Sequence, residues 1–76
     1  MNWDQIRGNW KQLKGSARKA WGDLTDDDLD KIEGERERLV GKIQERYGVA
    51  KAEAERRVDS WVSSIDKDAG RPRPRV

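Results

Sequence analysis

The chain has 76 residues, with no cysteine and no histidine, and its 17 basic and 15 acidic side chains leave a net charge of +2. A chain of this length forms a single small domain with a thin core, because folding buries only about 60% of the surface that the unfolded chain exposes. The missing residue types exclude disulfides, thiolate nucleophiles, imidazole catalysis and the usual zinc ligands, so we expect no enzyme, no metal site and no cofactor.

The first predicted element is a helix over residues 2–21. At 100° per residue, an arc of about 80° holds seven apolar side chains, namely Trp3, Ile6, Trp10, Leu13, Ala17, Trp21 and Leu24. Gly8 and Gly15 project to the opposite, solvent-facing side. Gly22 follows the last aromatic residue, at a place where a left-handed glycine commonly ends a helix. We therefore expect one continuous helix that stops at Gly22.

The second predicted element begins near Asp26, because Thr25 and Asp28 form a variant of the capping box. Its apolar side chains stay within an arc of about 100° as far as Tyr47, and Gly48 ends the pattern. The sequence leaves open whether this stretch is one helix or two helices joined near Gly34.

The third predicted helix covers residues 50–64. Its apolar spacing of four, four, three and four residues is set by Ala50, Ala54, Val58, Trp61 and Ile65. Residues 66–76 contain two prolines and alternating arginines without any apolar period. We therefore predict a helical domain at residues 1–65 and a disordered Arg/Pro-rich tail at residues 66–76.

Glycines recur in register when the chain is superposed on itself at an offset of 26 residues. The pairs are Gly8 with Gly34, Gly15 with Gly41 and Gly22 with Gly48. This pattern is either a weak internal repeat or a heptad-like spacing shared by chance. An interior glycine costs a helix about 1 kcal/mol relative to alanine. The glycines therefore predict one of two things. They allow bends or close helix crossings, or they serve the function by letting a partner approach the backbone or by keeping the stability of the domain low.

Several motifs together resemble the CsbD-like family of small bacterial proteins: GNWKQLKG, WGDLTDDDL, IEGERERLVGKIQERYG and a final tryptophan-bearing helix. The resemblance extends over residues 1–62 and does not include the tail GRPRPRV. The positions that carry it are Gly8, Trp10, Gly15, Trp21, Gly22, Thr25, Gly34, Gly41, Tyr47, Gly48 and Trp61. It implies an all-α bundle of three to four short helices, arranged as two hairpins packed across each other, with a break in the second element near Gly34 or Gly41. It also implies a role in the general stress response, with no established catalytic residue or mechanism.

A basic stripe is the main candidate for a binding surface. It consists of Arg7, Lys11, Lys14 and Arg18, which are spaced four, three and four residues apart beside the tryptophans. With the tail arginines Arg71, Arg73 and Arg75, it predicts weak electrostatic contacts to nucleic acid, or contacts of the first helix to an anionic membrane surface. The alternative is an ordinary solvated face, or a stripe neutralised by the acidic turn at residues 25–34, where five acids stand against one lysine.

The sequence does not support calcium binding or serine-based catalysis. A spacing similar to that of a calcium loop occurs, but Lys31 stands where such a loop requires glycine; the acidic residues concerned are Asp26, Asp28, Asp30 and Glu37. The serines have no histidine to activate them. We therefore predict a non-enzymatic stress-response protein that protects or binds other molecules, with weak nucleic-acid binding as the alternative.

The tryptophans and the apolar runs complete the prediction. We expect the tryptophans to form the core, and Trp3, nearest the N-terminus, is the one expected to be exposed if any is. The longest uninterrupted apolar run is two residues, which predicts neither a signal-peptide core nor a membrane span. This pattern and the absence of cysteine favour a cytoplasmic protein.

Overall fold

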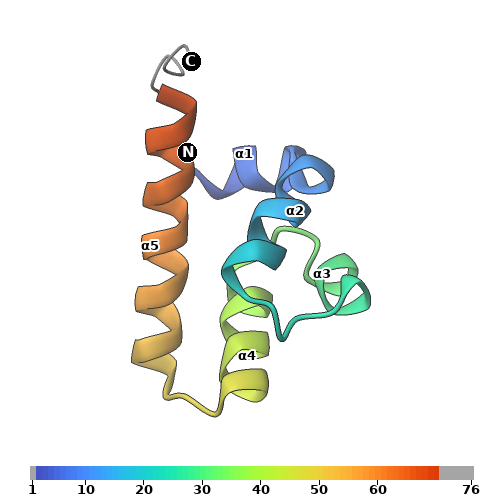
Figure 1. Cartoon of the computed structure of the whole chain (residues 1–76), viewed down its shortest axis with the longest axis vertical. Coiled ribbons are helices and arrows are strands. Elements are labelled where there is room, and N and C mark those ends of the chain that lie inside the picture. The colour runs from blue at the N-terminus through green and yellow to red at the C-terminus, as the bar shows by residue number, and fades with distance from the viewer. Residues whose placement is uncertain (1, 71–76) are drawn as a thin grey trace.

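The fold is known from a computed structural model, which describes the backbone of residues 2–70 and the side chains of residues 2–66. The described chain forms five helices: α1 (Trp3–Gly8), α2 (Trp10–Ala20), α3 (Asp26–Ile32), α4 (Arg36–Tyr47) and α5 (Lys51–Gly70). In Figure 1, α4 runs antiparallel to α5 beside its lower half, α1 and α2 lie to the right of the upper half of α5, and α3 lies to the right of α4. The predicted all-α bundle is confirmed, with five helices among the described residues where three or four were expected.

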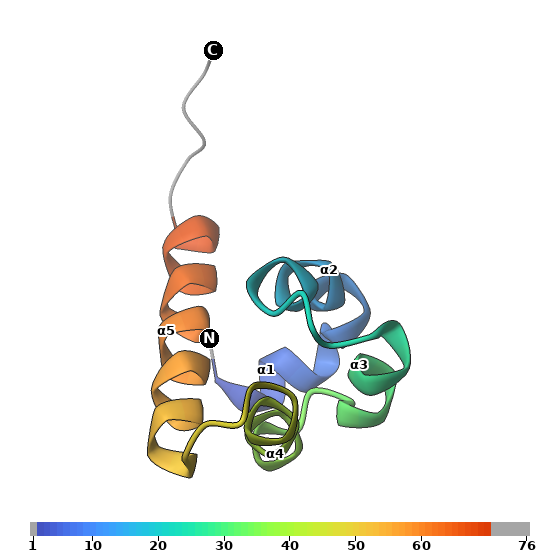
Figure 2. The same ribbon diagram turned by 60° about the horizontal axis from the view of Figure 1, so that its bottom comes forward.

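The predicted single helix over residues 2–21 is wrong, because the chain leaves the helical conformation at Asn9. Its backbone has φ −111° and ψ 20°, and its side-chain Nδ2 donates to the Gln5 carbonyl at 3.0 Å. Glycine weakens a helix and asparagine offers the backbone a competing hydrogen bond, so Gly8 and Asn9 together favour a break. Figure 2 shows that α1 and α2 run in different directions. The apolar stripe does not reveal the break, because the apolar side chains of α1 and α2 keep the same helical spacing across the single residue Asn9.

The end of α2 also differs from the prediction. The helix stops at Ala20, and Trp21 has a non-helical backbone at φ −131° and ψ 84°. Gly22 is not among the described residues with a positive φ, so its expected role as a left-handed helix end is wrong. The physical reason is that Trp21 is buried, and the chain turns toward the core at this aromatic residue.

The stretch from 26 to 47 consists of two helices, which resolves the alternative that the sequence left open. The capping box that starts α3 is present, because Asp28 N–H donates to Thr25 Oγ1 at 3.0 Å and Thr25 N–H donates to Asp28 Oδ2 at 3.1 Å. The break lies at Glu33 and Gly34, whose φ angles are 54° and 75°. Both residues therefore adopt a left-handed conformation between α3 and α4.

Gly34 also marks a close helix crossing. A Cβ atom at this position would lie 2.8 Å from the Cα atom of Arg7 in α1, a distance that real side chains do not tolerate. Gly48 ends α4 in the left-handed conformation, with φ 63° and a hydrogen bond of 2.9 Å from its N–H to the Gln44 carbonyl. For these two glycines, a turn or a crossing explains the residue type.

The last helix continues past its predicted end at residue 64. α5 runs from Lys51 to Gly70, so residues 66–70, which were assigned to the tail, are helical. Aspartate, lysine and alanine are compatible with a helix, and the first strong stop is Gly70 followed by proline at position 72. The rest of the predicted tail, residues 71–76, lies outside the described part of the chain.

Trp61 of α5 lies at the centre of the core. Its ring centroid is 5.4 Å from that of Trp21, 6.3 Å from Trp10 and 6.5 Å from Trp3. Two of the indoles donate hydrogen bonds through Nε1: Trp10 donates to the Leu29 carbonyl at 2.7 Å and Trp61 donates to Ser16 Oγ at 3.3 Å. Trp10, Trp21 and Trp61 are buried while Trp3 is only partly buried, in keeping with the predicted core role and the exception made for Trp3.

Candidate functional site

Three of the four cations in the predicted basic stripe form ion pairs within the chain. Arg7 contacts Asp4 at 3.1 Å and Glu35 at 3.0 Å. The other two pairs join α2 to α3 and are Lys14 with Asp30 and Arg18 with Asp26. The Lys14 and Arg18 pairs are contacts with the acidic turn at residues 25–34, which the sequence offered as an alternative to partner binding, whereas both partners of Arg7 lie outside that turn.

Lys11 is the stripe residue that forms no ion pair with the described part of the chain. Lys19, on the same helix, also has no acidic partner among the described residues. Through Gly70 the chain carries 14 basic and 15 acidic side chains, so the helical part has no positive excess of its own. The other three cations predicted to contact an anionic partner, Arg71, Arg73 and Arg75, lie outside the described residues.

An ionic cluster around the buried Asp28 carboxylate joins α3 to α4. The Asp28 carboxylate accepts hydrogen bonds from Arg46 Nε at 3.0 Å and from Arg46 Nη2 at 3.1 Å, and Lys42 Nζ lies 3.6 Å away. The side chain of Asp28 is only 6% exposed. The Arg46 hydrogen bonds, followed by the Thr25 backbone N–H, hold the pKa of this carboxyl well below its usual range. Asp28 is thus a helix cap and an ion-pair partner at once.

Three of the four acidic residues with calcium-loop spacing serve as ion-pair partners. Asp26 contacts Arg18, Asp28 contacts Arg46 and Asp30 contacts Lys14. Within the described residues, no group of three or more His, Cys, Asp or Glu side chains is arranged to hold a metal ion. The sequence predicted the cap at Thr25 and Asp28 but missed Arg46, because nothing in the sequence brings it next to α3.

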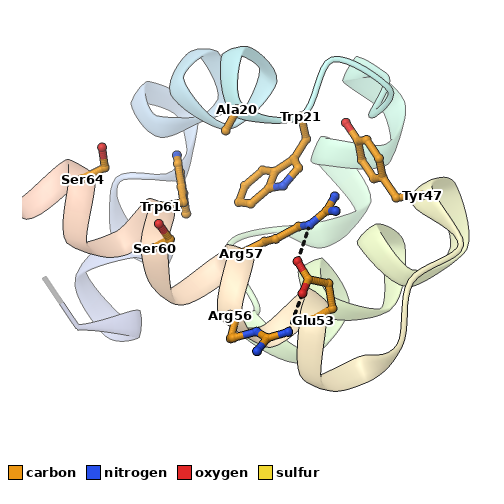
Figure 3. A pocket seen from close by; sticks show the side chains of 9 residues that line it. All are labelled: Ala20, Trp21, Tyr47, Glu53, Arg56, Arg57, Ser60, Trp61 and Ser64. Atoms are coloured by element: carbon orange, nitrogen blue, oxygen red, sulfur yellow. Dashed lines mark hydrogen bonds and ion pairs between the residues drawn. The ribbon is translucent and has the colours of Figure 1, made fainter.

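An open groove lies between the end of α2, the end of α4 and the middle of α5. Its volume is about 640 Å³. Figure 3 shows Trp21 across its middle, Trp61 beside it and Tyr47 at one end. The α5 side contributes the hydroxyls of Ser60 and Ser64. This combination of two indoles, a phenol and charged side chains was not predicted, because its members come from three separate elements.

Arginine 57 is the charged centre of this groove. Arg57 Nε donates to Glu53 Oε2 at 3.1 Å, and Arg57 Cζ lies 5.5 Å from the centroid of the Tyr47 ring. Arg56 Nη2 donates to the other Glu53 oxygen at 2.5 Å. The hydrogen bonds from Arg57 and then Arg56 lower the pKa of Glu53. Two guanidinium groups share one carboxylate, so the groove has a net positive charge.

Tyr47 of α4 contacts the two other elements that form the groove. Its hydroxyl oxygen accepts a hydrogen bond of 3.3 Å from the backbone N–H of Asp23, in the loop that follows α2. The loop, α4 and α5 are therefore joined through Tyr47 and the Arg57 guanidinium that lies over its ring. The spacing of Glu53 and Arg57 on one helix face was a signal in the sequence, but it is also that of an ordinary surface pair.

The motif positions of the sequence have distinct places in the structure. Trp10, Trp21 and Trp61 are core, Thr25 is a helix cap and Tyr47 is a wall of the groove. Gly34 and Gly48 have a positive φ. A Cβ atom would meet nothing within 4 Å at the remaining glycines, which are Gly8, Gly15, Gly22 and Gly41.

Fold and site define a small all-helical protein with a tryptophan-centred core and a surface on which opposite charges pair within the chain. In the part of the chain that the structure describes, no helix is both long and apolar enough to cross a membrane. Residues 4–56 match the sequence profile described as CsbD-like. The chain belongs to the CsbD-like family, which is associated with bacterial stress and is not a known enzyme family.

Similar proteins support this assignment. The UPF0337 protein YjbJ of Escherichia coli O6:H1 strain CFT073 is 62% identical over 66 residues, covering 87% of this chain and 96% of the relative. A UPF0337 protein of Pectobacterium atrosepticum is 62% identical over 61 residues, covering 80% and 88%. One of Nitrosomonas europaea is 52% identical over 66 residues, covering 87% and 70%.

Proposed function

We propose that this chain is a non-enzymatic, cytoplasmic protective protein, which keeps other proteins apart when they unfold or lose water. The observation that supports this proposal is the pairing of opposite charges across the helical surface. Charged residues make up 42% of the chain and the mean hydropathy is −1.19. The family association with bacterial stress supplies the context in which such a surface is useful.

Exposed ion pairs contribute little to stability, about 0–1 kcal/mol each, but their charged groups remain strongly hydrated. A nearly balanced charge avoids long-range attraction to nucleic acid or to other proteins. Molecules of this kind can separate aggregation-prone proteins without binding them tightly.

The test is protection of a client enzyme that aggregates on heating or drying, at equal masses of client and protein. We expect slower light scattering and more retained client activity than with an equal mass of an uncharged polymer. No protection at equal mass contradicts the proposal.

A matched variant separates the charged surface from mere crowding. The variant lacks both α2–α3 ion pairs, because the two cations and the two anions are replaced by neutral amides. The four substitutions are Lys14→Gln, Arg18→Gln, Asp26→Asn and Asp30→Asn. The net charge stays at +2 while four charges are lost, and we expect weaker protection. A helical circular dichroism spectrum equal to that of the parent protein shows that the variant remains folded.

Nucleic-acid binding through the basic stripe is less favoured by the geometry. Arg7, Lys14 and Arg18 already have acidic partners, and a phosphate would have to displace them. That function predicts an affinity that falls steeply with salt and weakens on charge reversal at Lys11 and Lys14.

A further inference from the structure

The groove beside Trp21 has the size and the lining of a small-molecule site. Its volume of about 640 Å³ falls within the range of about 300–1,000 Å³ that is typical of ligand pockets. Trp21 and Trp61 are only 4% and 6% exposed, so narrow edges of their rings, which are tilted by 58° with centroids 5.4 Å apart, form the apolar floor of the groove. Ala20 and Ser60 have short side chains and leave the groove open above this floor.

Arg57 has unused donors in the groove. Its Nε atom is engaged by Glu53, but its two terminal nitrogens have no acceptor among the described residues. In Figure 3 this end of the guanidinium lies between Trp21 and Tyr47. The terminal nitrogens of a guanidinium form a planar fork that fits both oxygens of a carboxylate.

Two contacts hold this fork in place before any ligand arrives. The Glu53 carboxylate fixes the Nε side, and the Tyr47 ring lies 5.5 Å below Cζ. Tyr47 is itself held by the Asp23 N–H. A donor that is already oriented loses less conformational entropy on binding.

From these observations we propose that the groove binds a small aromatic carboxylate. The ring of the ligand packs against the narrow ring edges of Trp21 and Trp61 that line the groove, where offset or edge-to-face contacts are favourable. Its carboxylate accepts two hydrogen bonds from the terminal nitrogens of Arg57. The hydroxyls of Ser60 and Ser64 lie along the α5 side and offer further polar contacts.

The test is a titration of the isotope-labelled protein with 2-naphthoate and with the neutral 2-naphthamide, followed by proton–nitrogen correlation spectra. We expect 2-naphthoate to shift the indole N–H signals of Trp21 and Trp61 and the Nε–H signal of Arg57. We expect the amide to bind at least about tenfold more weakly, because it offers no charged acceptor for the guanidinium. Equal affinities for the two compounds overturn the proposal.

Two arginine variants provide the matched comparison. Arg57→Gln removes the fork, whereas Arg56→Gln removes an arginine that lies on the far side of Glu53 from Trp21 (Figure 3) and is 76% exposed. We expect Arg57→Gln to abolish the preference for the carboxylate and Arg56→Gln to change the affinity less than about twofold. Equal losses in both variants would mean that general positive charge attracts the ligand, and this result also overturns the proposal.

A third variant tests the groove without altering its charge. Ser60 is exposed on α5, so Ser60→Trp introduces a large side chain at a position where the helix tolerates it. We expect the indole to fill the groove and to abolish binding of 2-naphthoate while the helical content is retained. Unchanged binding in this folded variant places the ligand elsewhere and contradicts the assignment.

Discussion

The first two helices and the next two have the same plan but different connections. Each pair consists of a short helix followed by a longer one, and α2 begins at Trp10 while α4 begins 26 residues later at Arg36. The glycines of the second pair adopt left-handed conformations at Gly34 and Gly48. Their counterparts Gly8 and Gly22 do not, because Asn9 and Trp21 end the helices there.

This difference shows that a repeated glycine spacing does not determine the backbone conformation at each glycine. Gly34 is needed because α1 crosses the chain there, with the Arg7 backbone in the space that a Cβ atom would occupy. Gly8 has open space around it. The tertiary contact, and not the local sequence, decides which member of each pair is irreplaceable.

The largest expected effect comes from Gly34→Ala. The new Cβ atom would be 2.8 Å from Arg7 Cα, and φ of 75° is unfavourable for alanine. Left-handed strain and overpacking together should lower the free energy of unfolding by about 3 kcal/mol. Chemical denaturation measures this change. The control is Gly8→Ala, which should not destabilise the protein; an equal loss in both variants would remove the proposed asymmetry.

The next largest effect is expected for Asp28→Asn, which weakens the ion pair that joins α3 to α4. The pKa of the native carboxyl is lowered, so its stabilising contribution is present above the ordinary aspartate pKa of about 4 and is lost as the pH falls below it. Thermal unfolding between about pH 7 and pH 2 should show a lower melting temperature at neutral pH and a flatter acid limb for the variant. Parallel profiles would exclude Asp28 as a source of acid sensitivity.

A smaller loss is expected for Gly48→Ala. Gly48 ends α4 with φ of 63°, and alanine in this conformation should cost about 1 kcal/mol of unfolding free energy. Gly22→Ala is the matched control, because Gly22 has no positive φ and no atom within 4 Å of a new Cβ. If urea denaturation finds the two variants equally destabilised, the contrast between the two helix ends is wrong.

The smallest effects should be stabilising. Gly15 and Gly41 lie inside α2 and α4, and both are exposed with open space around an added Cβ atom. Alanine at either position should raise the free energy of unfolding by about 0.5–1 kcal/mol, because it is the better helix former. Destabilisation at both positions would show that these glycines have a structural role that the contacts do not reveal.

The sequence predicted the features that depend on neighbouring residues. The cap at Thr25 and the apolar face of α5 through Trp61 follow from local spacing. The break at Asn9 was missed because the apolar phase continues across it. Arg46 and the groove around Arg57 were missed for another reason, since their partners Asp28 and Tyr47 come from other helices. Such pairings depend on helix packing, which the spacing of residues does not determine.

Three of the four cations of the basic stripe, Arg7, Lys14 and Arg18, are neutralised by acidic partners within the chain. The most direct test is a proton–nitrogen correlation spectrum of the labelled protein, titrated with a short DNA duplex at low and at physiological salt. We predict dispersed signals whose positions along α2 remain unchanged at physiological salt. Shifts at Lys11, Lys14 and Arg18 that persist at physiological salt would contradict the claim and favour a nucleic-acid surface.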